Sequence, residues 1–269
     1  MSSVELYKHL LDNCSESLRK YTSNFPTHES QFHFSEFNEI TFEKMYLQLK
    51  RILPRQQLFT QIPELEKVCK GCWAFYLSPR NKSVKHLDIR YGKVFENALR
   101  NFLISLGFNC VRSDELGFKK NYPDLAFLMP SGSPTAFFEV KYLTAPFVKV
   151  YEKVPGRECY EGSTTLDVDD KFKRQREIVE NEIHVPVYYV YWIDYPCIKG
   201  VFYMPAKEVF AYVDRTVLEW SRKEREGDFI SVNGKKMKVG HTEKVYLPLL
   251  TMMNLEKLVK SLKAVSQDF

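Results

Sequence analysis

The sequence predicts an α/β protein with a mixed central sheet flanked by helices and a mostly helical N-terminal region. Apolar residues recur at helical spacing before about residue 85, and the strongest amphipathic helix covers residues 91–107. The predicted elements then follow as three strands, a helix and two strands. With 269 residues, of which 44% are apolar, the chain can bury one sizeable core or two small ones.

Composition limits the functional classes. The N-terminal residues are polar and charged, and no stretch approaches the length of a membrane span, so we expect a cytoplasmic protein without membrane contacts. The net charge is 39 − 34 = +5. Between residues 199 and 263, 13 Lys and Arg stand against 8 Asp and Glu, so residues 216–269 are interpreted as a basic C-terminal segment. That charge fits a nucleic-acid partner and an ordinary solvated surface equally well.

Residues 1–85 form the first predicted unit, with apolar positions such as Phe42, Met45 and Tyr46 at helical spacing. The unit also contains Cys69 and Cys72, a Cys-x-x-Cys pair that can supply half of a structural zinc site. The sequence has no second pair at ligand spacing, so we expect reduced thiols rather than bound zinc.

The helix over residues 91–107 begins the predicted core, which spans residues 86–215. Gly107 offers its C-terminal stop. Strands are expected at residues 108–112, 124–129 and 136–143, with a Pro- and Gly-containing turn between the last two. One apolar stripe follows the helix and is formed by Val94, Phe95, Ala98, Leu99, Phe102, Leu103 and Leu106.

Residues 144–169 carry several Pro and Gly without a clear period, and we predict a long loop that covers a functional site. A charged helix at residues 171–183 and strands at 185–193 and 200–204 complete the core. The aromatic residues of the first of these strands are interpreted as core rather than as a base-stacking platform: Tyr188, Tyr189, Tyr191 and Trp192.

A carboxylate and an amine interrupt the apolar strand at residues 136–143. Strand side chains alternate, so Glu139 and Lys141 share one face, where their burial is costly without partners. Asp124, at the start of the neighbouring strand, can reach Glu139. Two adjacent carboxylates repel each other unless a hard cation lies between them, and oxygen ligands suit Mg²⁺. The pattern therefore predicts a magnesium site.

Such a site suits phosphodiester hydrolysis. A bound Mg²⁺ polarises a phosphate oxygen and lowers the pKa of a bound water. Lys141 would orient or deprotonate the attacking water, or stabilise the pentavalent phosphorane. The alternative without catalysis is an ion pair on an edge strand.

The order Pro123-Asp124, fourteen residues, Glu139-Val140-Lys141 resembles the PD-(D/E)xK nuclease superfamily, which includes many type II restriction endonucleases, Holliday-junction resolvases and repair nucleases. The likeness covers residues 88–206. It implies a restriction-endonuclease-like fold and Mg²⁺-dependent DNA hydrolysis, with Mn²⁺ substituting for Mg²⁺. It also implies metal ligands from the preceding helix, where Glu96 matches, and from the main-chain carbonyl of Val140.

The helix after the motif adds expected contacts. Some branches of the superfamily carry Gln-x-x-x-Tyr there, whereas here Gln175 is followed by Val179, which speaks against those exonuclease-like branches. Gln175 and Lys171 are expected to contact phosphate or water, and Lys173 to contact nucleic acid. For the lysines, a solvated helix face is the alternative.

The resemblance implies a sequence-specific type II restriction endonuclease of a restriction-modification system, acting on double-stranded DNA. A homodimer is expected because one site per subunit cuts one strand. The sequence has no P-loop, so ATP is not expected. Residues 1–85 are candidates for DNA recognition or dimerisation. Two alternatives stay open: a structure-specific nuclease of repair, recombination or a mobile element, and an idle nucleic-acid-binding module, against which the intact motif speaks.

Overall fold

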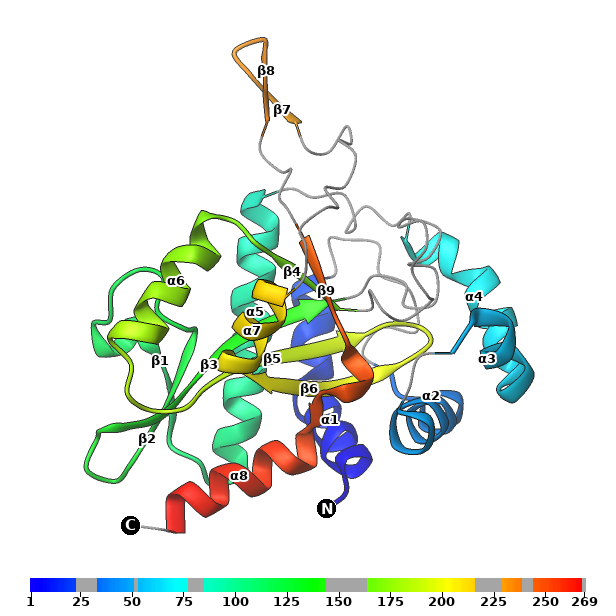
Figure 1. Ribbon diagram of the computed structural model, residues 1–269, viewed down its shortest axis with the longest axis horizontal. Helices are drawn as coiled ribbons and strands as arrows, with labels where there is room; N and C mark the ends of the chain where they lie inside the picture. Colours follow the sequence, from blue (N-terminus) through cyan, green and yellow to red (C-terminus); the bar gives the residue numbers. More distant parts are fainter. Residues whose placement is uncertain are drawn as a thin grey trace.

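A computed structural model of the chain describes residues 1–22, 33–50, 53–76, 85–143, 164–215, 229–238 and 244–267. At its centre lies a six-stranded mixed sheet in the order β1-β2-β3-β5-β6-β10 (Figure 1). Strands β3 and β5 run parallel, and the other neighbours run antiparallel. The strands are Cys110–Arg112 (β1), Leu125–Leu128 (β2), Pro134–Leu143 (β3), Val187–Asp194 (β5), Lys199–Pro205 (β6) and Met253–Asn254 (β10).

Helices flank this sheet, and two separate strand pairs accompany it. The pairs are Thr164–Asp167 (β4) with Lys244–Leu247 (β9), and Phe229–Val232 (β7) with Lys235–Lys238 (β8). The helical segments are Ser3–Thr22 (α1), Glu36–Thr41 (α2), the π-helical Phe42–Leu49 (η1), Arg55–Gln61 (α3), Pro63–Tyr76 (α4), Lys85–Ser105 (α5), Ser113–Leu116 (η3), Asp170–Asn181 (α6), Ala206–Arg215 (α7), Leu249–Thr251 (η6) and Leu255–Gln267 (α8).

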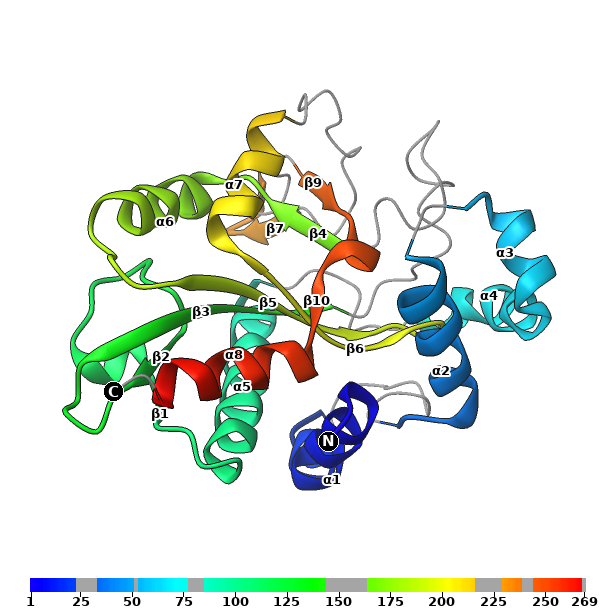
Figure 2. The same ribbon diagram turned by 60° about the horizontal axis from the view of Figure 1, so that its bottom comes forward.

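Two helical layers cover the two faces of the sheet, and strand alternation decides which residues meet which layer. Figure 2 shows α1, α5 and α8 on one side and α6 and α7 on the other. Phe138 and Trp192 pack with the α1, α5 and α8 layer. Phe137, Tyr189 and Tyr191 pack with the α6 and α7 layer. A position on β3 therefore commits its side chain to one layer.

The fold class and the core elements are confirmed at the level of a mixed α/β protein. Five strands and one helix were expected in the core after residue 107, and β1, β2, β3, α6, β5 and β6 begin and end within two residues of the predicted bounds. Helix α5 ends as expected: Gly107 has φ +91°, and the Phe108 N–H donates to the Leu103 carbonyl at 3.2 Å, which closes the last turn. The aromatic run is core, since Tyr189, Tyr191 and Trp192 are fully buried.

The predicted loop at residues 144–169 is wrong at its end. Residues 144–163 lie outside the described residues, but β4 forms a strand that pairs with β9, with Thr164 opposite Leu247. Strand β4 has only four residues, which are too few to show the alternation of apolar and polar residues that predicts a strand. Its partner comes about 80 residues later, so no neighbouring segment indicates the pairing either. The C-terminal segment, for which no element was predicted, contains β7, β8, β9, β10 and α8.

The N-terminal helices share the cores of the sheet. Leu6 and Leu10 of α1 pack in the same cluster as Phe95 of α5. Cys69 is buried on α4, and the side chain of Cys72 lies outside the described residues. In the part of the chain that the structure describes, no helix has the length and apolar character needed to cross a bilayer.

Candidate active site

The site begins where β2 starts beside β3. Leu125 of β2 pairs with Phe138, so Asp124 stands opposite Glu139, one step beyond the last paired position. The Val140 N–H donates to Asp124 Oδ2 at 2.8 Å. The Asp124 carboxylate thus accepts the hydrogen bond that the carbonyl of a neighbouring strand would otherwise accept at this point.

The main-chain carbonyl of Val140 lies on the same side of β3 as Asp124. In an extended strand, the N–H and the C=O of one residue point toward the same neighbour. The N–H of Val140 points at Asp124, and Phe137, of opposite parity, donates to the Pro186 carbonyl beside β5. The Val140 carbonyl therefore points past the beginning of β2, next to the carboxylate.

Glu139 is the charged centre of the site and is only 1% exposed. Its Oε1 accepts from Lys141 Nζ at 2.6 Å and from Lys171 Nζ at 3.3 Å, and its Oε2 accepts from Gln175 Nε2 at 2.7 Å. Burial alone raises the pKa of a carboxyl group, but these cations and hydrogen bonds outweigh it and lower the pKa of Glu139 to about 2. Glu139 is therefore a buried, ionised carboxylate.

Helix α6 brings two of these partners to Glu139. Asp169 caps its N-terminus by accepting from the Phe172 N–H at 2.9 Å. Lys171 and Gln175 are four residues apart and so share the helix face that meets Glu139. The Tyr189 hydroxyl donates to Gln175 Oε1 at 2.7 Å, which fixes the orientation of the Gln175 amide. Lys173 lies exposed on α6, away from the cavity at Glu139.

The charges of the site act on one another. Burial, together with the charges of Glu139 and Glu96, raises the pKa of Asp124 well above its usual range. Burial lowers the pKa of Lys141, but Glu139 and Asp124 outweigh this and raise it above its usual value. The Lys141 side chain is 31% exposed and lines the cavity that opens at Glu139.

Glu96 approaches from the other layer. It lies on α5, and its Oε2 accepts from Arg112 Nη1 of β1 at 3.0 Å. Burial raises the pKa of Glu96, and Arg112 counteracts that rise. The charge of Glu96 acts on Asp124 and Glu139, but its closest partner is this arginine. The structure thus brings Asp124, Glu139 and Lys141 together and leaves Glu96 at the edge.

A cavity of about 260 Å³ opens at Glu139. Its other lining residues come from the ends of β3, β4 and α6 and from β5: Lys141, Leu143, Thr165, Leu166, Asp167, Asp169, Lys171, Phe172, Gln175 and Tyr189. Two other hollows in the described structure are larger than this cavity. One hollow of about 900 Å³ lies between α6 and α7, and another of about 620 Å³ lies between α7 and η6.

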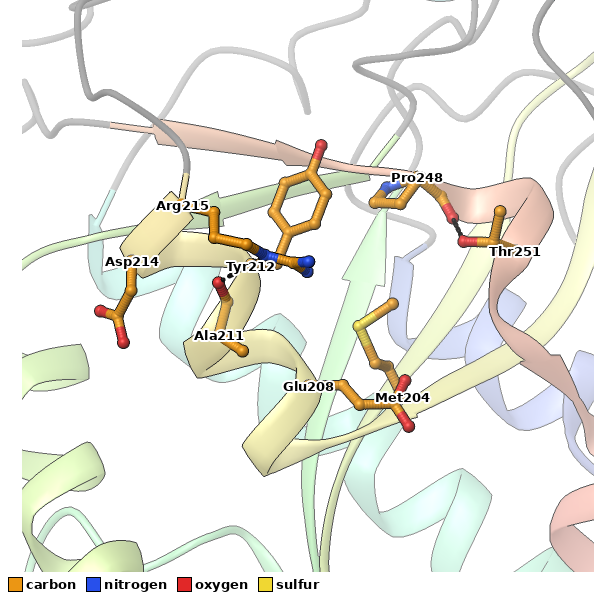
Figure 3. A pocket seen from close by; sticks show the side chains of 8 residues that line it. All are labelled: Met204, Glu208, Ala211, Tyr212, Asp214, Arg215, Pro248 and Thr251. Atoms are coloured by element: carbon orange, nitrogen blue, oxygen red, sulfur yellow. Dashed lines mark hydrogen bonds between the residues drawn. The ribbon is translucent and has the colours of Figure 1, made fainter.

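The hollow at α7 and η6 offers no comparable chemistry. Figure 3 shows Arg215 folded back on its own helix, where its Nε donates to the Ala211 carbonyl at 3.1 Å, and Thr251 bonded to the Pro248 carbonyl. None of the residues singled out from the sequence lines this hollow. The smaller cavity, where buried charges converge, is therefore the candidate active site.

The donor set fits a hard cation. Carboxylates of Asp124 and Glu139 and the Val140 carbonyl are oxygen ligands of the kind Mg²⁺ prefers. Among the described residues, no three His, Cys, Asp or Glu side chains are grouped closely enough to hold a metal ion as they stand. Lys141 and Lys171 neutralise the charge of Glu139, and Arg112 neutralises that of Glu96. A bound cation would compete with these ammonium and guanidinium groups for the same carboxylates.

The sequence did not predict that Tyr189 and Arg112 contact residues of the site. Tyr189 was assigned to the core, which is correct, but its hydroxyl also bonds Gln175. Arg112 ends the first predicted strand, and its ion pair with Glu96 joins residues of two elements. No pattern in the sequence indicates either contact, because each depends on which side chains meet across elements.

No protein-family model matches the chain, and no curated protein matches it. The fold and the site define a mixed α/β protein with a buried carboxylate, flanked by lysines, beside the parallel pair of its central sheet. The assignment to a family therefore depends on the motif and its geometry.

Proposed function

We propose that the chain is a Mg²⁺-dependent endonuclease with the restriction-endonuclease-like fold, acting on duplex DNA in the manner of a type II restriction endonuclease. One observation carries the proposal: Asp124 holds the backbone of β3 at Val140, between Glu139 and Lys141. Asp124, which fourteen residues separate from Glu139 in the sequence, thereby contacts the strand whose Glu139 and Lys141 line the cavity. An edge-strand ion pair would not need the Asp124 contact, and β3 is an interior strand.

The residues that would hold the metal are Asp124, Glu139 and the Val140 carbonyl, with Glu96 as a further ligand if it leaves Arg112. A divalent cation bound there supplies charge that polarises the phosphate and lowers the pKa of a coordinated water. Mn²⁺ presents similar chemistry to the same oxygen ligands.

The chain's own residues position the reactants. The ammonium group of Lys141, which lines the cavity, can donate to a phosphate oxygen or to the attacking water, and Lys171 adds a second positive charge there. Gln175 holds Glu139 Oε2 in place. In the reaction the water oxygen bonds to phosphorus, one ester P–O bond breaks, and the departing oxygen takes up a proton.

The test is cleavage of supercoiled plasmid and of junction DNA by the purified protein in Mg²⁺ and in EDTA. Asp124→Ala and Lys141→Ala should each lower the rate at least about 100-fold, as expected when a charge-stabilising group is removed. Glu64→Gln and Lys257→Ala, exposed on α4 and α8, are the matched controls and should cut like the wild type.

The products separate the alternatives. Discrete plasmid fragments support sequence-specific cleavage, whereas cutting of junctions alone indicates a structure-specific nuclease. DNA binding without Mg²⁺-dependent cleavage indicates an idle module. If cleavage is undiminished in both Asp124→Ala and Lys141→Ala, the site is elsewhere. Sedimentation of the protein tests the expected homodimer.

A further inference from the structure

Strands β7 and β8 form a hairpin whose turn is encoded locally. Val232 pairs with Lys235 across Asn233-Gly234. Both turn residues have positive φ, +52° and +74°, which is the conformation of a type I′ turn and explains the choice of Asn and Gly. The sequence therefore specifies a tight two-stranded ribbon at this point.

The ribbon is exposed along residues 231–237. Opposite residues share a face, so Ser231 and Lys236 lie on one face, while Val232, Lys235 and Met237 lie on the other. Val232 is 40% exposed and Met237 is 50% exposed. An isolated two-stranded hairpin is marginally stable in water, so a partner that covers this apolar pair would stabilise it.

The positive charge of the ribbon indicates the chemical class of its binding partner. Residues 229–238 contain three lysines and no acidic residue, so the ribbon is complementary to a polyanion. The major groove of B-DNA admits a two-stranded β-ribbon, and it presents the apolar methyl group of thymine as well as hydrogen-bonding groups. A ribbon with lysines and an apolar face matches both properties of that groove.

The ribbon is also within reach of DNA held at the candidate site. Figure 1 shows it projecting beyond the end of the molecule that carries β4 and β9. Lys238 ends β8 and Lys244 begins β9, which is 244 − 238 = 6 residues later. Lys244 pairs with Asp167, which lines the cavity at Glu139. Six residues span at most about 20 Å, or about 6 base pairs of duplex at 3.4 Å each.

We infer that the β7–β8 hairpin enters the major groove of the duplex DNA whose backbone occupies the cavity at Glu139. The position of that duplex rests on the proposed function. The face with Val232, Lys235 and Met237 lies against base edges and the flanking phosphates, and Lys236 on the opposite face adds positive charge to the ribbon. The hairpin thereby contacts the bases that determine which DNA sequence the protein binds.

The test measures binding of a fluorescent 30-base-pair duplex in Ca²⁺ between 50 and 200 mM salt. The double variant K235E/K236E should weaken binding about tenfold or more and reduce the slope of log K against log salt by at least about 1, since each lost phosphate contact removes about 0.9. K257E/K263E makes the same charge change on α8, at the other end of the molecule in Figure 1, and should bind like the wild type. Circular dichroism checks that all variants are folded.

A second readout locates the groove. Bound wild-type protein should protect guanine N7, which lies in the major groove, from dimethyl sulfate. V232S/M237S should lose this protection while keeping the salt slope. Protection of adenine N3 alone places the ribbon in the minor groove and overturns the inference.

Other outcomes separate this inference from the proposed function. If K235E/K236E keeps the affinity and slope of the wild type, the hairpin does not bind DNA, even where Asp124→Ala abolishes cleavage. If hairpin variants lose affinity while Asp124→Ala cuts like the wild type, the inference stands and the catalytic site is wrong. If the variants change the sedimenting mass and leave DNA affinity unchanged, the ribbon joins two copies of the chain and the inference fails.

Discussion

The substitution Tyr189→Phe removes one hydroxyl group from the support of Glu139. Tyr189 donates to Gln175 Oε1 at 2.7 Å, and Gln175 donates in turn to Glu139 Oε2 at the same distance. Tyr189 is fully buried and Gln175 is 2% exposed, so only a water molecule inside the cavity at Glu139 could replace the lost donor. The variant therefore leaves a buried amide oxygen without its hydrogen bond.

The magnitude follows from that geometry. A buried acceptor left unsatisfied costs about 1 to 3 kcal/mol, so we expect the free energy of unfolding to fall by about 2 kcal/mol. For a domain of this size, that corresponds to a melting temperature lower by about 4 to 8 °C. Thermal unfolding followed by circular dichroism measures it. Because the Gln175 amide is then free to turn, kcat should fall with KM nearly unchanged.

Tyr191→Phe is the matched control. Tyr191 lies two residues further along β5, on the same face and equally buried, and its hydroxyl has no hydrogen-bond partner among the described residues. Removing it should leave stability unchanged or slightly higher. Equal losses of stability in the two variants would refute the reasoning, since burial of the ring and not the hydrogen bond would then decide the result.

Three further outcomes are expected. Lys199→Met should cost about 3 to 5 kcal/mol in urea unfolding because it leaves the buried Asp194 unpaired, and the double variant D194N/K199M should recover much of the loss; no recovery would contradict this. Arg112→Met should lower the melting temperature in EDTA and make it rise with Mg²⁺ more than in the wild type, since Glu96 loses its partner; an unchanged Mg²⁺ response would exclude Glu96 as a ligand. Gly107→Ala should cost about 1 to 2 kcal/mol through backbone strain alone, because an added Cβ meets nothing within 4 Å; a stability equal to the wild type would show that residue 107 can leave its positive φ.

Elements with a local pattern could be predicted from the sequence. The apolar stripe of α5 and its stop at Gly107 are written in consecutive residues, as is the alternation that puts Glu139 and Lys141 on one face. Pairing of distant segments could not be predicted in the same way. Strand β4 has four residues, and β9 completes it only after most of the C-terminal half of the chain.

In the candidate site, too, the features with a local sequence pattern could be predicted and the contacts between distant segments could not. Asp124, Glu139 and Lys141 follow from strand parity and a turn between neighbouring strands. The partners of Glu96 and Gln175 do not, because Arg112 and Tyr189 reach them through tertiary packing. The metal and DNA contacts of these residues stay predictions.

The layer formed by α1, α5 and α8 has a consequence for biosynthesis. Helix α1 packs on α5 and α8, and the hydroxyl of Tyr7 accepts from the Trp192 indole N–H at 3.1 Å. The sheet face beneath these helices is therefore complete only when α8 has been made, 267 − 143 = 124 residues after the end of β3. At 5 to 20 residues per second, the part of this face that α8 covers stays open for roughly 6 to 25 s after β3 is made, which is long enough for a chaperone to bind it.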